Sequence, residues 1–131
     1  MKISTKGQYA VRLMVEIAKC EGYVPISTIA KNQELSVKYL EQIVSLLVKH
    51  NLLESERGHK GGYRLTKSPS DYSIKEILET TGDITGVVPC VKGDCKRRHI
   101  CSTAGVWTTL SILIGNYLAG VSLQDLIDNN I

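Results

Sequence analysis

The chain has 131 residues, 43% of them hydrophobic and 22% charged, and carries a formal net charge of +3. This length allows one domain with a substantial core and excludes two. The mild charge permits an anionic partner without demanding one, so the placement of the charges matters more than their sum.

The start of the chain lacks the apolar run and the small-residue cleavage site of a signal peptide. The longest apolar stretch, residues 104–121, is interrupted by polar residues and is short for a membrane span. We therefore expect a soluble, cytoplasmic protein with no membrane partner. Free thiols stay reduced there, so clustered cysteines favour metal binding or redox sensing over structural disulfides.

Apolar residues recur at helical spacing near the start of the chain and predict two helices. The first is capped by Ser4 or Thr5 and ends before Gly22. The second is short, covers residues 27–34 and is capped by Ser27.

A third helix opens at Ser36 and is expected to end at Asn51. Its apolar positions again follow the helical period and predict one buried stripe. The stripe consists of Val37, Leu40, Ile43, Val44, Leu47 and Val48.

Two short runs, Leu53–Glu56 and Tyr63–Thr66, flank a loop that contains three glycines. This pattern predicts a β-hairpin whose tip is wider than a two-residue turn. Ser73 and Glu76 then form a predicted capping box for a helix that runs to about Thr81.

Residues 103–119 form a long predicted helix that is apolar nearly all round. The side chains of residues 112–114 would point in three directions, and the N-terminal part of the chain can cover only one face. We therefore expect a twofold partner, with Trp107 and Leu113 in the interface. A final short helix is capped by Ser122.

Two short helices joined by a tight turn and followed by a glycine-tipped basic hairpin are typical of a winged helix-turn-helix. The expected fold class is mainly α, with a two-stranded wing and a long dimerisation helix. By role, residues 1–80 form the DNA-binding domain and residues 81–102 a cysteine-bearing sensor loop. Residues 103–131 form the dimerisation helix and the short C-terminal helix.

The exposed side of the third helix carries the hydrogen-bonding side chains that reading of the major groove requires. Gln42 can bond adenine and Glu41 can accept from cytosine, whereas Ser36, Lys38 and Tyr39 suit phosphates. Such residues are equally expected on a solvated helix face. The order of the elements favours nucleic-acid binding.

The hairpin offers a cationic tip, which suits the minor groove or the flanking phosphates. Its four candidate contacts are Arg57, His59, Lys60 and Arg64. Lys2, Lys6 and Arg12 extend the same surface. Basic loops are also common without such a role, so here too the element order carries the interpretation.

Three cysteines, Cys90, Cys95 and Cys101, lie within the stretch "CVKGDCKRRHIC". Structural zinc sites usually pair cysteines more closely and add a second pair or histidines further on, and this chain has no second pair. Wide spacing in a loop suits a larger object such as an iron–sulfur cluster. Basic neighbours would lower the pKa values of the thiols and offset the charge of a cluster. These neighbours are Lys92, Lys96, Arg97 and Arg98.

Three other interpretations of the cysteines stay open. The loop could carry zinc, with His99 completing a Cys3His site. It could be a metal-free switch that forms a disulfide on oxidation, or the thiols could be inert. Cys20 is separate from this loop and is interpreted as a small buried hydrophobic residue near the end of the first helix.

The stretches "MKISTKGQYAVRLM", "YLEQIVSLLVKHNLL" and "RGHKGGYRL" resemble the IscR-like winged-helix regulators, the bacterial iron–sulfur cluster regulator family. The resemblance covers essentially the whole chain, including the closing "SLQDLI". It implies a homodimeric transcription factor, a repressor, that binds a pseudo-palindromic DNA operator. It also implies that Glu41, Gln42 and Arg57 stand at the base-reading positions.

Family members with three cysteines in this loop commonly hold a 2Fe–2S or 4Fe–4S cluster, so the resemblance implies an iron–sulfur cluster of either type, and we favour 2Fe–2S. One branch takes a fourth ligand from a histidine three residues after the last cysteine, where this chain has Ala104. Another takes an acidic residue of the partner, where this chain has Gln8. The fourth ligand stays open between His99, Gln8 of the partner subunit and an exogenous small molecule.

An enzymatic or electron-carrier function finds little support in the sequence. There is no nucleotide-binding glycine motif, no recognisable pair of catalytic carboxylates and no nucleophile with a partner base. We therefore expect a DNA-binding regulator and not an enzyme. A metal-free regulator that works through a protein partner is the other option within the family.

Overall fold

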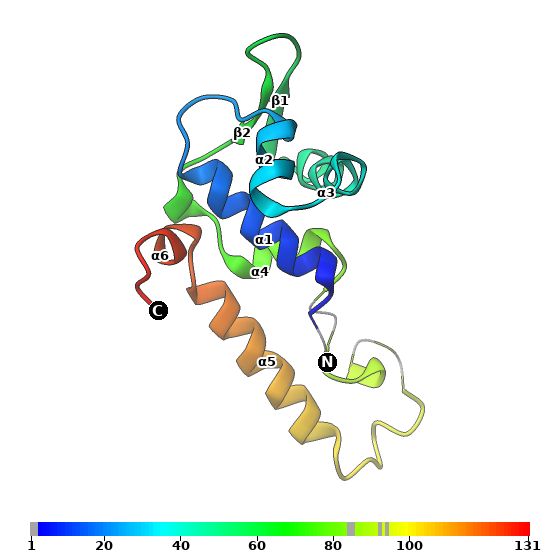
Figure 1. Cartoon of the computed structure of the whole chain (residues 1–131). Coiled ribbons are helices and arrows are strands. Elements are labelled where there is room, and N and C mark those ends of the chain that lie inside the picture. Colours follow the sequence, from blue (N-terminus) through cyan, green and yellow to red (C-terminus); the bar gives the residue numbers. More distant parts are fainter. Residues whose placement is uncertain (1–2, 84–85, 92, 94) are drawn as a thin grey trace.

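The computed structural model describes residues 3–83, 86–91, 93 and 95–131. Helix α1 (Thr5–Ala18) lies at the centre of the molecule, and the remaining helices of the first 80 residues surround it (Figure 1). The hydroxyl of Ser4 accepts a hydrogen bond from the Gly7 N–H at 2.9 Å, so Ser4 caps the helix and Thr5 does not. The side chains that α1 buries are Ala10, Leu13, Met14 and Ile17.

Helix α2 (Ile26–Gln33) and helix α3 (Val37–Lys49) form the helix-turn-helix. Glu34 makes the turn between them with a left-handed φ of 55°. The prediction that Ser27 caps α2 was wrong, because the helix starts one residue earlier, behind Pro25. Proline fixes φ and lacks the N–H that a helix start leaves unpaired, so it suits this position.

The predicted stripe of α3 is largely confirmed, with Leu40, Ile43, Val44 and Leu47 buried. Val37 is 40% exposed, so its assignment to the stripe was wrong. It is the first residue of α3, where the helix reaches the edge of the core. Val48 is only partly buried.

The predicted hairpin is confirmed as strands β1 (Leu53–Glu56) and β2 (Gly62–Leu65), which pair antiparallel with Glu54 opposite Arg64. Tyr63 also exchanges two backbone hydrogen bonds with Val24, at 2.8 and 2.9 Å. A Cβ on Gly62 would lie 2.2 Å from the Val24 carbonyl oxygen. The base of the wing is therefore fastened to the connection between α1 and α2.

A 3-10 turn (Pro69–Asp71) leads into helix α4 (Ile74–Thr80). The Ser73 hydroxyl accepts from the Glu76 N–H at 3.0 Å, but the predicted capping box is wrong in its second half. The Glu76 carboxylate pairs instead with the Lys67 ammonium at 3.0 Å. The longer Lys67 side chain reaches this carboxylate from outside the helix.

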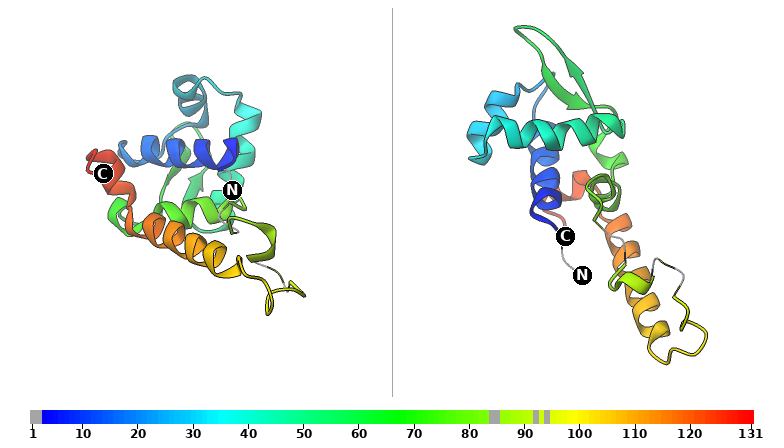
Figure 2. Two further views of the ribbon diagram at one scale, coloured as in Figure 1. Left: turned by 90° about the horizontal axis from the view of Figure 1, so that it is seen from below. Right: turned by 90° about the vertical axis from the view of Figure 1, so that its right-hand side faces the viewer.

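Helix α5 (Ala104–Gly120) contacts α4, and its N-terminal half extends beyond the other helices (Figure 1 and Figure 2). The same end of the molecule holds the described part of residues 86–103, a range that we call the cysteine segment and that includes a 3-10 turn (Pro89–Val91). No helix in the described part of the chain has both the length and the apolar character that a bilayer crossing requires.

Helix α6 (Leu123–Ile127) closes the chain behind a capping box formed by Ser122 and Asp125. Leu123 is fully buried in the same core as α1. Its N–H donates to the Tyr72 carbonyl at 3.0 Å, which ties the end of the chain to the start of α4. The mainly α fold with a two-stranded wing is confirmed, while the division of the chain by role stays a prediction.

Candidate nucleic-acid interface and cysteine cavity

The exposed face of α3 carries Lys38, Glu41 and Gln42. Their spacing of three and four residues places them together on one side of the helix. Ser36 stands at the end of this face, where its hydroxyl accepts from the Tyr39 N–H at 3.1 Å. This hydroxyl therefore caps α3, and the orphan N–H groups of the first turn lie beside it.

Tyr39 is half-buried and lies next to the exposed face of α3. It also packs on α1. Its ring meets the ring of Tyr9 edge to face, with 6.0 Å between the centroids. The guanidinium of Arg12 lies 4.9 Å from the centroid of Tyr9, on the same helix. The start of α1 therefore adjoins the start of α3, as the extended basic surface requires. Lys2, predicted for this surface, lies outside the described residues.

The wing holds its four predicted cations in two different settings. Arg57, His59 and Lys60 are exposed around the tip, and in the part of the chain that the structure describes none of them forms an ion pair. Arg64 lies at the base, where it is hydrogen-bonded to the Glu54 carboxylate and stacks 4.4 Å from the centroid of Tyr23. The hydrogen bond that Arg64 donates to the Glu54 carboxylate raises the pKa of Arg64. Three of these side chains are thus free for a partner and one is engaged.

The three loop cysteines lie near the N-terminal end of α5. They line one cavity of about 120 Å³, which is walled mainly by apolar groups. Its lining comprises Val88, Cys90, Val91, Cys95, Arg98, Cys101, Thr103, Ala104, Trp107 and Thr108. The sequence did not predict that Trp107 and Thr108 of α5 would share this cavity with the thiols.

Cys101 differs from the other thiols in its surroundings. Its sulfur lies 3.3 Å from the Thr103 hydroxyl, and this hydrogen bond is the main reason that the pKa of Cys101 is lowered. Further lowering comes from the backbone N–H groups of Thr103 and Ala104. In the described part of the chain these hydrogen bonds, and not basic side chains, account for the lowering. The effect of the basic neighbours on the thiols stays a prediction.

The donor chemistry of the cavity fits an iron–sulfur cluster, because three thiols from one segment face one apolar space. Among the residues that the structure describes, however, no three His, Cys, Asp or Glu side chains are grouped closely enough to hold a metal ion. His99 is exposed and does not line the cavity. Gln8 is exposed on α1, where its amide donates to the Ile3 carbonyl at 3.2 Å. Lys92 lies outside the described residues.

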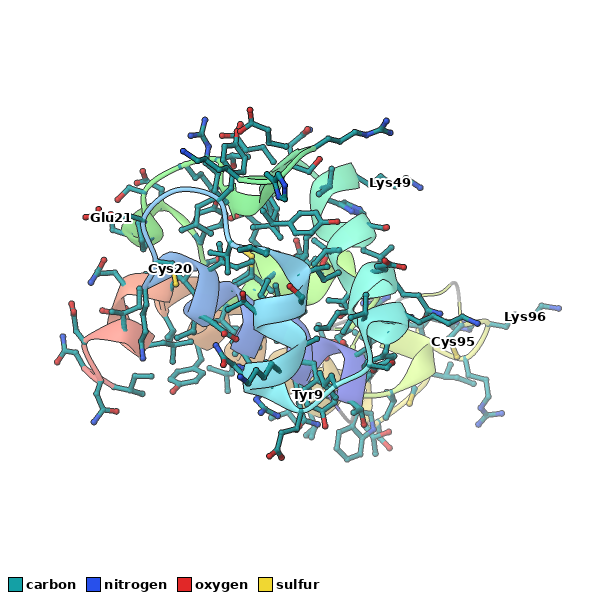
Figure 3. All side chains as sticks on the ribbon, turned by 45° about the horizontal axis from the view of Figure 1, so that its top comes forward. Tyr9, Cys20, Glu21, Lys49, Cys95 and Lys96 are labelled. Atoms are coloured by element: carbon teal, nitrogen blue, oxygen red, sulfur yellow. The ribbon has the colours of Figure 1, made fainter. Side chains whose placement is uncertain are left out.

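Cys20 is exposed, so its interpretation as a buried residue was wrong. It lies two residues beyond the end of α1, outside the amphipathic stripe. Figure 3 shows Cys20 and Cys95 on opposite sides of the molecule, with Lys96 extending outward beyond Cys95. Cys20 is therefore separate from the cysteine cavity.

Helix α5 carries an apolar stripe on the side that faces away from α4. Leu113 and Tyr117 are 59% and 60% exposed, and Val106 and Leu110 continue the same line at helical spacing. Gly115, on the opposite side, is the one buried residue of α5, all of which is described. Trp107 is 37% exposed, so the protomer covers it only in part.

Asp83 is a contact that the sequence did not reveal. Its carboxylate accepts from the Ser4 N–H at 2.9 Å and from the Ser4 hydroxyl at 2.8 Å. The only local indication of this contact was an absence: the first turn of α1 contains no acidic side chain of its own.

A helix-turn-helix with an exposed polar face on its second helix, flanked by a wing with free cations, defines a winged-helix DNA-binding regulator. Residues 3–129 match the Rrf2 family, described as iron-dependent transcriptional regulators, and the chain belongs to this family. The prediction that the chain is not an enzyme is confirmed, because the family and its named relatives are transcriptional regulators.

The chain is similar to curated and structurally known regulators over almost its full length. It is 35% identical to the HTH-type transcriptional regulator IscR of Photorhabdus laumondii, across 98% of this chain and 80% of that protein. The structure of CymR, the global cysteine regulator of B. subtilis, matches with a TM-score of 0.80 and 32% identity, covering 100% and 99% of the two chains. T. potens IscR matches with a TM-score of 0.78 and 32% identity, covering 100% and 89%.

Proposed function

We propose that this protein is a homodimeric, cytoplasmic repressor whose affinity for its DNA operator is tuned by an iron–sulfur cluster. The observation that carries the proposal is that Cys90, Cys95 and Cys101 all line one apolar cavity at the start of α5. Membership in a family of iron-dependent regulators gives this arrangement of thiols its most direct use.

The proposed DNA contacts fall into two sets. Glu41 and Gln42 of α3 read base edges in the major groove, because they are exposed and have the required hydrogen-bonding groups. Arg57 at the wing reads bases as well. The sequence-independent contacts to phosphates come from Ser36, Lys38, Tyr39, His59, Lys60 and Arg64. Arg64 reaches DNA only by leaving the Glu54 carboxylate or by bridging it.

The proposed dimer uses the apolar stripe of α5. Four large side chains on one line of a helix, each 39–61% exposed, form a patch that water solvates poorly. A second copy offers the same patch, and a twofold arrangement covers both at once. Two wings and two α3 helices then face two half-sites of a pseudo-palindromic operator.

The cluster is held by the thiolates of Cys90, Cys95 and Cys101, with His99 or Gln8 of the partner subunit as the fourth ligand. We favour 2Fe–2S over 4Fe–4S. When bound, the cluster supplies a link between the three thiolates that iron supply and oxidation can make or break. The chain's own contribution is the apolar wall, the Arg98 cation and the donor atoms.

Anaerobic purification followed by iron, sulfide and zinc analysis tests the cluster directly. We expect iron and sulfide together with visible absorbance that Cys90→Ala, Cys95→Ala or Cys101→Ala each abolishes. Cys20→Ala is the matched control, because this thiol is exposed on the opposite side of the molecule. A colourless wild-type protein that contains zinc or no metal contradicts the cluster.

A second candidate, a thiol-redox regulator of the same fold without iron, is favoured by Cys101. This thiol is exposed and its pKa is lowered by Thr103, and both properties promote oxidation. The same purification separates the two candidates. A metal-free protein whose operator affinity changes on oxidation, and in which Cys101→Ala removes the change, supports the thiol switch.

A further inference from the structure

Asp83 binds the start of α1 from a position 79 residues further along the chain. Its carboxylate accepts hydrogen bonds from the backbone N–H and the hydroxyl of Ser4, and from the Thr81 hydroxyl at 2.5 Å. The Ser4 oxygen at the same time accepts the Gly7 N–H. A continuous chain of hydrogen bonds therefore runs from Asp83 through Ser4 into the first turn of α1.

The first turn of α1 is shaped to receive this carboxylate. It has no acidic side chain of its own, although negative charge at a helix N-terminus interacts favourably with the helix dipole. Asp83 supplies that charge from outside the helix. Gly7 leaves the necessary room, since a Cβ there would lie 2.2 Å from Asp83 Oδ2. A side chain at position 7 and the carboxylate of Asp83 in its present position cannot occupy this space together.

The hydrogen bonds also keep Asp83 charged. Partial burial raises the pKa of this carboxyl, but hydrogen bonds from Thr81 and Ser4 together outweigh burial and lower the pKa below its ordinary value. The contact is therefore between a carboxylate and the helix N-terminus at neutral pH, and not between two neutral groups.

Asp83 stands between the two parts of the molecule to which the proposed function gives different roles. Beyond it the chain enters the cysteine segment, where the Val87 N–H donates to the Ser111 hydroxyl of α5 at 3.1 Å. On its other side α1 carries Tyr9, whose ring packs edge to face on Tyr39 of α3. Figure 1 shows the start of α1 and the cysteine segment toward the same end of the molecule, away from the wing.

We propose that Asp83 is a positioning residue that couples the cysteine segment to the DNA-binding surface through the first turn of α1. The inference rests on the proposed function, since it assumes two states of the segment and DNA contact by α3. A state that draws Asp83 away from Ser4 removes the outer cap of α1 and frees the turn before Tyr9. A state that keeps Asp83 in place holds Tyr9 against Tyr39 and so fixes the start of α3.

A purely structural cap is the alternative, and it differs in one measurable respect. Loss of a cap lowers the stability of the fold but leaves the segment and the DNA surface independent of each other. Coupling has a reciprocal consequence. If a change of state in the cysteine segment changes the affinity for DNA by some factor, then DNA binding changes the equilibrium between the segment's states by the same factor. The thiols of the cysteine segment report that change directly.

The test uses metal-free protein and a DNA duplex that this protein selects from a random-sequence pool. Mass spectrometry follows maleimide labelling of the segment's thiols with and without saturating duplex. In the wild type we expect duplex to change at least one labelling rate by about fivefold or more, and in Asp83→Asn by less than about twofold. Glu79→Gln is the matched control and keeps the wild-type response, because it removes an exposed carboxylate of α4.

A folded Asp83→Asn protein whose thiols respond to duplex as in the wild type overturns the proposal. If Asp83→Asn loses cooperative unfolding, Ser4→Ala cuts the same link at the hydroxyl and takes its place. A wild-type protein that binds no duplex in either its metal-free or its iron- and sulfide-loaded form refutes the proposed function, and the coupling falls with it. A wild-type protein that binds duplex without any change in labelling refutes the coupling alone.

A second readout uses protein loaded with iron and sulfide. The ratio of operator Kd values between the metal-free and loaded forms, expected at about tenfold or more in the wild type, falls below about threefold in Asp83→Asn. Iron and sulfide content stay equal in the two proteins, because Asp83 does not line the cysteine cavity. An unchanged ratio at equal content refutes the coupling.

Discussion

Replacement of Leu113 tests the proposed dimer where its cost can be worked out. Complete burial of a leucine side chain contributes about 1.5–3 kcal/mol. Leu113 is 59% exposed in the protomer, so a partner that covers it adds roughly 0.9–1.8 kcal/mol per chain. A twofold dimer contains two copies of Leu113, so together they contribute roughly 2–3.5 kcal/mol to association. Leu113→Ala should therefore weaken the dimer by roughly 30- to 300-fold in Kd.

Leu113→Glu should have a larger effect than Leu113→Ala. It loses the same contact and also places an unpaired carboxylate in the interface on each side, which costs several kcal/mol more. Sedimentation equilibrium over a range of protein concentrations measures both Kd values. Ala119→Glu adds the same charge at an exposed position of α5 outside the stripe and should remain dimeric. A Leu113→Glu protein with the dimer mass at micromolar concentration would place the interface elsewhere.

Four further predictions concern DNA reading and stability. Glu41→Ala should reduce discrimination between matched and mutated operators by ~1–3 kcal/mol. Lys60→Ala should instead weaken binding to all sequences and reduce the log–log salt slope by about 0.9, both measured by fluorescence anisotropy; the reverse pattern would refute these assignments. Asp83 has a lowered pKa, so its stabilising effect is present above the ordinary carboxyl pKa and is lost as pH falls below about 4. The difference in urea midpoint between wild type and Asp83→Asn should therefore shrink between neutral pH and that range, and a constant difference would contradict the assignment. Tyr72→Phe should lower the free energy of unfolding by ~1–3 kcal/mol, because the buried hydroxyl donates to the Leu52 carbonyl and accepts from the Thr66 N–H. An unchanged urea midpoint would show that water replaces that hydroxyl.

Periodicity and turn chemistry predicted the parts of the fold that depend on near neighbours in the chain. The buried face of α3 and the hairpin follow from such local patterns. Local patterns failed at the ends of elements, where Val37 has the right spacing but lies at the edge of the core. The prediction that Cys20 is buried was wrong for the same reason, since this residue lies past the last turn of α1.

The candidate site was predictable in its residue types but not in its contacts. The exposed side chains of α3 and the wing tip follow from the helix-turn-helix pattern. The engagement of Arg64 by Glu54 depends on the register of the hairpin, which the glycine-rich tip left open. The bond between Ser4 and Asp83 joins residues 79 positions apart, and only tertiary packing brings them together.

The attachment of the wing to the α1–α2 connection governs where the hairpin tolerates change. Gly62 lies against the Val24 carbonyl, and a Cβ on Gly61 would lie 2.2 Å from the Glu56 carbonyl oxygen, so neither position accepts a side chain without a shift of the backbone. Gly58, at the tip, has no atom within 4 Å of the Cβ it lacks. The exposed positions 59 and 60 can therefore carry bulky labels, whereas a side chain at position 61 or 62 would meet backbone atoms. A fluorophore attached at position 59 would report the approach of a ligand to the wing without loosening the wing from the body of the protein, at the loss of the proposed His59 contact.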